Sequence, residues 1–351
     1  MSKKEKEWRK FCAAQRGHKR FIRSVKRQKK IHVPIYPEVI IMPSDKPKKI
    51  PNGIEIEKKL PSDFSITSNI EGVVAFFKGF SAFKYRKVRK IAFDMSNVTN
   101  IDIGAIVMLL THVTKLADER IFVTGNYPKD ESCKQIFEES GFFEHVKEMN
   151  SQRNNCNNQF NLIVKTGREK TESVLTGTTI KKAVKHITGS EQHYTPVQSI
   201  VQEMAGNAVE HAYNDRKFWL FCVNLSNDEL IFVLSDAGAG ILSTLNRKYK
   251  KIIDTLSLRD NIEILYRAYD KKYNSITDEV NRNKGLPLIK QSSDKRRIMN
   301  LKVITNNVYL DFDNLNESKN LKHKYSGTLY IWKINKEILE NYGEDNKGSR
   351  V

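Results

Sequence analysis

The clearest hydrophobic pattern in the chain lies within residues 195–212. Apolar side chains recur there every three or four positions, and a Thr-Pro pair at the start supplies an N-cap and a first helical residue, so the segment is predicted to be an amphipathic helix. Glu203, Asn207 and His211 are spaced four residues apart and therefore share one face beside the apolar stripe. The stripe consists of Val197, Ile200, Val201, Met204, Ala205, Ala208, Val209 and Ala212.

Two β-rich runs follow this helix. Residues 217–223 and 229–235 are rich in aromatic and β-branched side chains, and the polar segment 224–228 between them predicts a hairpin turn. The second run ends in the segment 236–240, which reads Asp-Ala-Gly-Ala-Gly. Its glycines predict a sharp turn directly after the strand.

The preceding part of the chain alternates strands and helices. Residues 88–94 and 120–124 are predicted strands, and each is followed by a predicted helix, the first reaching Leu116 and the second covering 131–140. Such alternation is typical of a layered α/β domain. We place this domain at residues 62–148.

The polar residues of the predicted helix and hairpin have complementary chemistry. A carboxylate at Glu203 can orient or deprotonate a nucleophile, and a carboxamide oxygen at Asn207 can contact Mg²⁺ whose charge is balanced by phosphates. Asp236 can accept a hydrogen bond from an exocyclic amine such as that of adenine, and the glycines after it let the backbone approach a flat ring. Taken singly, these features also fit an exposed helix face or an ordinary glycine turn.

Two further motifs extend the series. Residues 283–290 read Asn-Lys-Gly-Leu-Pro-Leu-Ile-Lys, in which loop amides and a helix N-terminus can meet phosphates. Pro287 lies in the predicted first turn of that helix, a position that suits proline. In the family that this segment resembles, a second glycine is usual at this position. Residues 326–328, Ser-Gly-Thr, lead into the β-rich run 329–334. Across residues 195–334 the four elements resemble the nucleotide site of the GHKL family, which includes gyrase, MutL and the histidine kinases.

The resemblance implies a GHKL α/β sandwich, with helices over a mixed sheet, in residues 161–336, and it implies ATP and Mg²⁺ as ligands. Glu203 corresponds to the catalytic residue and Asn207 to the Mg²⁺ ligand. Residues 241–282, which include a predicted helix over 258–272, correspond to an ATP lid that orders around the triphosphate. The residues implied in nucleotide binding are Asn207, His211, Asp236, Gly238, Gly240, Lys284, Gly285, Leu286 and Thr328.

Within this family, the motif Glu-x-x-x-Asn-Ala-x-x-His-Ala-Tyr of residues 203–213 is most similar to that of the anti-sigma-factor serine kinases. Only some seventeen residues follow Ile334, whereas gyrase-like and MutL-like ATPases need a further domain there. Histidine kinases need long paired helices with a phosphoacceptor histidine upstream, and the sequence predicts none.

The segment 94–102, Asp-Met-Ser-Asn-Val-Thr-Asn-Ile-Asp, resembles the signature of the STAS domain, the fold of the anti-sigma-factor antagonists. In the antagonists, the residue after the last aspartate is often a phosphorylated serine. Ile103 occupies that position here, so a regulatory phosphoserine is not expected at this point. A generic α/β module is the alternative interpretation.

Composition indicates a folded protein, because 39% hydrophobic and 9% aromatic residues in a chain of 351 suffice for two packed domains. No run of about eighteen apolar residues occurs, and the first thirty residues lack the apolar centre of a signal peptide. We therefore expect a cytoplasmic protein without a membrane span. The cysteines have neither metal-like nor paired spacing, so reduced thiols are expected. They are Cys12, Cys133, Cys156 and Cys222.

Positive charge is concentrated at the amino terminus. Residues 1–30 hold thirteen Lys and Arg against two Glu, which is +11 of the total net charge of +19. Aromatic residues interleave with the basic ones, so this arm can follow a phosphate backbone and stack on bases. An acidic protein, an anionic membrane surface and a solvated tail are the other interpretations. The nucleic-acid candidates are Arg9, Lys10, Arg16, Lys19, Arg20, Arg23, Lys26 and Arg27.

The predicted organisation is an arm (1–31), a proline-containing linker or edge strands (32–61), the STAS-like domain, a second linker (149–160), the GHKL domain and a polar tail (337–351). The expected function is that of a Mg·ATP-binding bacterial regulator that hydrolyses ATP slowly or transfers a phosphoryl group to a partner protein. The alternative is a nucleotide-gated binding module that senses nucleic acid through the arm, for example in antiviral defence. A protein partner is expected, and a homodimer is compatible with the sequence.

Overall fold

The chain divides into two compact units, Met1–Glu38 and Val39–Val351. Every residue that the computed structural model describes belongs to the second unit. The predicted arm with its eight nucleic-acid candidates, and the predicted linker 149–160, lie outside the described residues. The described residues are 39–41, 53–80, 83, 88–140, 142, 146–148, 162–167, 173–210, 218–255, 260–270 and 285–348.

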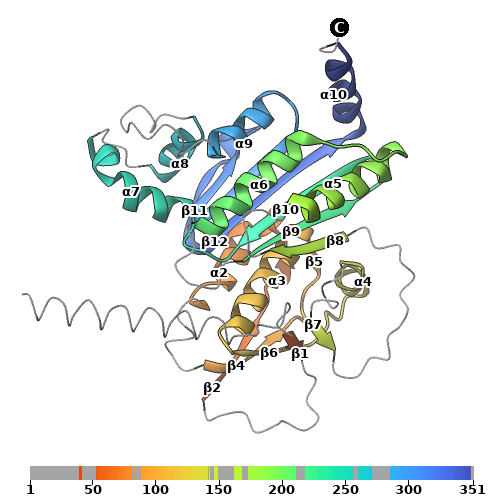
Figure 1. The fold of residues 1–351 in the computed structure, drawn as a ribbon. Coiled ribbons are helices and arrows are strands. Elements are labelled where there is room, and N and C mark those ends of the chain that lie inside the picture. Colours follow the sequence, from red (N-terminus) through yellow and green to blue (C-terminus); the bar gives the residue numbers. More distant parts are fainter. Residues whose placement is uncertain are drawn as a thin grey trace, which may run out of the picture. The chain divides into compact units, whose positions relative to one another are not determined.

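A five-stranded antiparallel sheet runs through the carboxyl-terminal half, in the order β11-β12-β10-β9-β8 (Figure 1). The predicted hairpin is confirmed, because β9 and β10 pair antiparallel with Phe232 opposite Val223. The strands are β8 (Leu162–Gly167), β9 (Trp219–Leu225), β10 (Glu229–Asp236), β11 (Met299–Asp311) and β12 (Lys319–Asn335).

The expectation that this sheet is mixed is wrong for the described strands, because each pair of neighbours runs antiparallel. β10 and β11 do point in the same direction, because β12 lies between them and pairs antiparallel with both. β12 therefore separates the two strands that share a direction.

Three helices cover one face of this sheet: α5 (Ser173–Thr188), α6 (Thr195–Glu210) and α9 (Gly285–Asp294) (Figure 1). The predicted apolar stripe of α6 faces the core, since six of its eight members are buried. Beneath the helices, the rings of Phe232 and Trp332 stack across β10 and β12 at 5.5 Å. Burial of these apolar surfaces fixes which face of α6 is turned away from solvent.

The segment between β10 and α9 contains two helices, α7 (Ile241–Thr255) and α8 (Asn261–Tyr269). The α8 helix is shorter than the predicted 258–272, because Asp260 caps its N-terminus and Asp270 is its C-cap. Its predicted apolar face is confirmed in part, with Leu265 and Tyr269 buried and Ile262 and Tyr266 packed at the edge of the core.

The last described element differs from the expected polar tail. Residues Lys336–Gly348 form helix α10, and Leu339 is buried in the core under it. Tyr342, one turn further on, packs edge-on against Tyr194, with 4.9 Å between the ring centroids. A short 3₁₀ helix, η4 (Leu315–Glu317), lies between β11 and β12.

A second sheet is entirely parallel in its described strands and has the order β2-β4-β6-β1-β7. The predicted strand–helix alternation of this half is confirmed. The segment expected to be a linker or edge strands supplies β2 at the sheet edge and β1 at an inner position. The elements are β1 (Val39–Ile41), β2 (Ile54–Lys59), β3 (Asp63–Phe64), α2 (Ile66–Phe76), β4 (Val88–Asp94), β5 (Asn100–Ile101), α3 (Ile103–Asp118), β6 (Phe122–Gly125), α4 (Glu131–Glu139) and β7 (Val146–Glu148).

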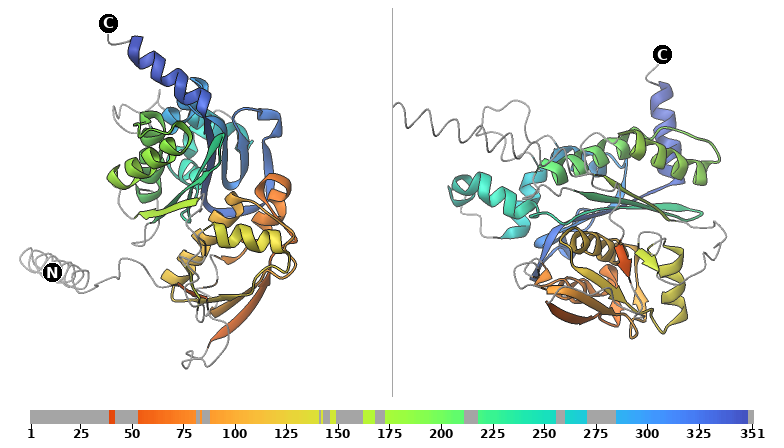
Figure 2. Two further views of the ribbon diagram at one scale, coloured as in Figure 1. Left: turned by 90° about the vertical axis from the view of Figure 1, so that its right-hand side faces the viewer. Right: turned by 60° about the horizontal axis from the view of Figure 1, so that its bottom comes forward.

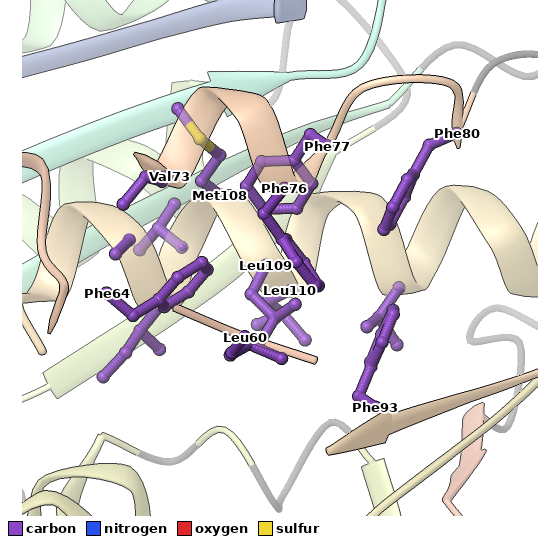
Figure 3. Packing of buried hydrophobic residues seen from close by; sticks show 14 of the residues in the cluster. Leu60, Phe64, Val73, Phe76, Phe77, Phe80, Phe93, Met108, Leu109 and Leu110 are labelled. Atoms are coloured by element: carbon purple, nitrogen blue, oxygen red, sulfur yellow. The ribbon is translucent and has the colours of Figure 1, made fainter. Parts of the chain in front are cut away.

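Helices α2 and α3 lie between the two sheets and belong to one continuous core with both (Figure 2). A dense group of aromatic and aliphatic side chains fills this layer (Figure 3). The ring of Phe77 lies 4.3 Å from that of His112 on α3 and 6.2 Å from that of Tyr325 on β12. The antiparallel sheet contributes Leu220, Cys222, Val233, Ile304, Leu321, Tyr325 and Leu329 to the same cluster.

Two acidic residues of the segment 94–102 stabilise local structure. Asp102 is the N-cap of α3 and accepts hydrogen bonds from the Ala105 amide at 2.8 Å and the Ser65 hydroxyl at 2.7 Å. Asp94 accepts from the Asn126 amide and the Ser96 backbone, which lower the pKa of its carboxyl to about 2. Ile103 packs against the shared core, so this position is used for packing.

The expectations about membrane spans and cysteines concern the whole chain, of which the structure describes a part. The described helices include none that is long and apolar enough to cross a lipid bilayer. Cys133 and Cys222 are buried free thiols, as expected, whereas Cys12 and Cys156 lie outside the described residues.

Candidate nucleotide-binding site

Glu203 and Asn207 lie on the same face of α6, directly against the first residue of α9. A Cβ atom added to Gly285 would stand 2.6 Å from Oε2 of Glu203 and 3.5 Å from Nδ2 of Asn207. The first residue of α9 therefore lies close to both side chains, and a side chain at position 285 would require the Glu203 carboxylate to move. Two motifs separated by some eighty residues in the sequence are brought together here.

The side-chain amide of Asn207 has an unmet hydrogen-bonding demand. Its Nδ2 atom is buried and has no hydrogen-bond partner among the residues that the structure describes. A buried polar group without a partner is costly, and a catalytic role, a water molecule or an ion can account for it. Rotating the amide by 180° would present its oxygen at the same place, where it could contact a cation. The residue thus fits the predicted role of Mg²⁺ ligand.

Helix α9 begins within the segment 283–290, which is predicted to meet phosphates. It runs for ten residues from Gly285, and Pro287 lies in its first turn, as the sequence suggested. The free amides at this end give it a partial positive charge that favours anions. The side chain of Leu286 packs against the core below, so only its backbone is placed for ligand contact. His211 and Lys284 lie outside the described residues.

The opposite end of the site is formed where β10 stops. Asp236 is its last residue and pairs with Thr328 on β12. Its Oδ1 accepts a hydrogen bond of 2.7 Å from the Gly238 amide, which closes the turn. Gly327 has a φ of +127°, and a Cβ there would collide with the Asp236 carbonyl oxygen. The glycine before Thr328 is thus required by the close approach of the two strands.

Burial makes Asp236 an unusual carboxyl group. Only 8% of its surface is exposed, and this burial raises the pKa from 3.8 to about 6, although hydrogen bonds from Gly238 and Thr328 and the charge of Lys115 partly oppose the rise. Such a carboxylate has lost much of its hydration. A ligand amine that donates to it would restore a lost hydrogen bond, as an adenine exocyclic amine can.

The glycine turn is fixed by residues that the sequence did not single out. Asn306, on β11, donates from Nδ2 to the Ala239 carbonyl at 2.9 Å and accepts the Ser243 amide of α7 at 3.2 Å. Its φ is +52°, and it lies at a bulge in β11. Gly240 has a φ of +82°, and a Cβ there would collide with the Asn306 side chain. An asparagine inside a β-rich run gives no sequence signal for this role beyond its tolerance of positive φ.

No protein-family model matches the chain, and a search of curated proteins finds no significant match. The functional interpretation therefore depends on the motifs and on their arrangement. In the described part of the chain, no group of three or more His, Cys, Asp or Glu is arranged to hold a metal ion.

Proposed function

We propose that this chain binds Mg·ATP between α6, α9 and the end of β10, and that Glu203 orients or deprotonates the group that attacks the terminal phosphate. The observation that carries the proposal is the proximity of Gly285, the first residue of α9, to the side chains of Glu203 and Asn207. It supports a site in which a carboxylate, a carboxamide and a helix N-terminus share one small space.

Each residue has a distinct part in this proposal. Asp236 accepts the hydrogen bond of the adenine amine, and Thr328 supports it from the neighbouring strand. The amides at the start of α9 bind phosphate oxygens. Asn207 would hold Mg²⁺, which supplies charge neutralisation of the phosphates when bound.

The proposed reaction is slow ATP hydrolysis or phosphoryl transfer to a partner protein, in bacterial regulation. Phosphoryl transfer is catalysed mainly by positioning and charge stabilisation, so a single carboxylate suffices as the base. The acceptor is water in the first case and a serine hydroxyl of the partner in the second. In both cases Glu203 holds or removes the proton of the attacking oxygen.

Replacing Asn207 with Ala should weaken Mg·ATP binding by up to about tenfold, because one hydrogen-bonding or metal contact is worth about 0.5–1.5 kcal/mol. Isothermal titration of the intact protein, with Mg²⁺ and with EDTA, would measure this. The effect should be larger with Mg²⁺ than without it. Gln198→Ala, on the same helix, is the control. Equal affinities for Asn207→Ala and the unmodified protein would contradict the placement of the ATP phosphates beside Asn207.

A second candidate function, nucleic-acid sensing, rests on the net charge of +11 in residues 1–30. We expect that removing residues 1–30 abolishes most binding to DNA or RNA and leaves ATP affinity unchanged. Each lost phosphate contact should reduce the log–log salt slope by about 0.7–0.9. Fluorescence anisotropy with labelled single and double strands at several salt concentrations measures this slope. An unchanged slope in the truncated protein would place the binding surface within residues 31–351.

A further inference from the structure

The turn that follows Asp236 is contacted from the other side of the antiparallel sheet. Lys115 belongs to α3, the helix between the two sheets, and its Nζ donates a 3.1 Å hydrogen bond to the Ala237 carbonyl. Ala237 is the first residue of the glycine turn. The half of the molecule that resembles a STAS domain therefore reaches the proposed base-binding end of the site through the Lys115 side chain.

The charge of Lys115 also acts on Asp236. Burial lowers the pKa of the Lys115 ammonium, and the carboxylates of Glu119 and Asp236 oppose this by favouring its charged form. Conversely, the positive charge of Lys115 lowers the pKa of the Asp236 carboxyl. In the described structure it is the only cation that contributes to this pKa. The other titratable groups that face Asp236 are the phenols of Tyr325 and Tyr330 on β12, whose pKa values are raised by burial.

We propose that Lys115 is a positioning residue of the nucleotide site: it fixes the Ala237 carbonyl and keeps Asp236 in the charged form that accepts the adenine amine. This inference rests on the proposed function and adds a residue to that site. It also makes nucleotide affinity depend on where α3 lies, because a displacement of α3 would withdraw the ammonium from the turn.

The sign of the pH effect follows from the chemistry of Asp236. The carboxylate is the better acceptor, so ATP affinity should fall as pH decreases through about 6, the pKa of this carboxyl in the folded protein. A nearby opposite charge lowers a carboxyl pKa, although the effect of Lys115 on Asp236 is smaller than that of the hydrogen bonds from Gly238 and Thr328. Removal of the ammonium should therefore move the midpoint of the affinity–pH curve upward by up to about one unit, and it should reduce affinity at pH 6 by up to about fivefold.

The test uses the full chain with Lys115→Met, Lys115→Gln and Lys115→Arg, and measures ATP affinity from pH 5 to pH 8.5. Met and Gln should both raise the midpoint, whereas Arg, which keeps the charge, should restore it. Gln retains a donor for the Ala237 carbonyl, so it separates the charge from the hydrogen bond and provides a second neutral variant if Met does not fold. A purely structural role for Lys115 would not move the midpoint.

Lys333→Met is the matched control, because Lys333 forms an ion pair of 2.7 Å with Glu229 at the other end of β10. It should leave the midpoint unchanged. A wild-type midpoint in both neutral Lys115 variants overturns the inference alone, with the proposed function intact. Failure of the unmodified protein to bind ATP at any pH overturns the proposed function, and the inference with it.

Discussion

ATP turnover should fall by about 10²–10⁴-fold when Glu203 is replaced by Gln, with ATP affinity nearly unchanged. General-base catalysis contributes a factor of this size. Gln has the same shape as Glu, so its fit beside Gly285 is kept while the proton acceptor is lost. Single-turnover phosphate release and equilibrium binding, measured on the same preparation, separate the chemical step from binding.

The neighbouring substitution Gln202→Ala is the control, because adjacent helix residues point about 100° apart. Turnover that survives in Glu203→Gln would show that another group acts as the base. If turnover is lost but the cellular activity of the protein persists, the nucleotide-gated switch is the better description, since ATP binding alone would then be sufficient.

Replacing Asp236 with Asn should weaken ATP binding by about 1–3 kcal/mol, or roughly 5- to 150-fold. Oδ1 already accepts the Gly238 amide, so an Asn that keeps this bond must turn its NH₂ group toward the adenine amine. Two donors would then face each other. Calorimetry with ATP, with the exposed turn variant Asp228→Asn as control, tests this. Unchanged affinity would place adenine elsewhere.

The same substitution should change the pH dependence of stability. The folded pKa of Asp236 is raised from 3.8 to about 6, so the folded state binds the proton more tightly than the unfolded state does. Protonated Asp236 therefore contributes fully to the stability of the folded state below pH 3.8, and this contribution is lost as pH rises through about 6. The loss is about 3 kcal/mol at most for the nucleotide-free protein. In urea unfolding, the free energy of unfolding of the unmodified protein should be lower at pH 7 than at pH 4.5 because of Asp236. This difference between the two pH values should be smaller in Asp236→Asn.

Local patterns predicted the parts of the site that are encoded by neighbouring residues. The spacing of Glu203 and Asn207 sets their common face, and the run before Asp236 forms a strand with its partner in a hairpin. These features depend on helical and strand periods, which the sequence displays directly. The position of Pro287 in the first turn of α9 belongs to the same class.

Features that depend on distant pairing could not be predicted in this way. The insertion of β12 between β10 and β11 pairs β12 with β10 across some ninety residues of sequence, and local periodicity does not display such a pairing. Asn306 and Lys115 meet the glycine turn from segments far away in the sequence, and neither lies in a motif. The inner strand β1 has only three residues, too few for alternation to identify it.

The cluster shared by α2, α3 and the antiparallel sheet limits how this protein can be divided. A cut within residues 150–158 would leave one fragment with the apolar sides of α2 and α3 uncovered and another with the corresponding sheet face uncovered. Uncovered patches of this kind promote aggregation. The protein would therefore not tolerate exchange of either half for an unrelated module. A replacement for either half, or a partner that takes its place, would have to bury the same apolar surface of the half that remains.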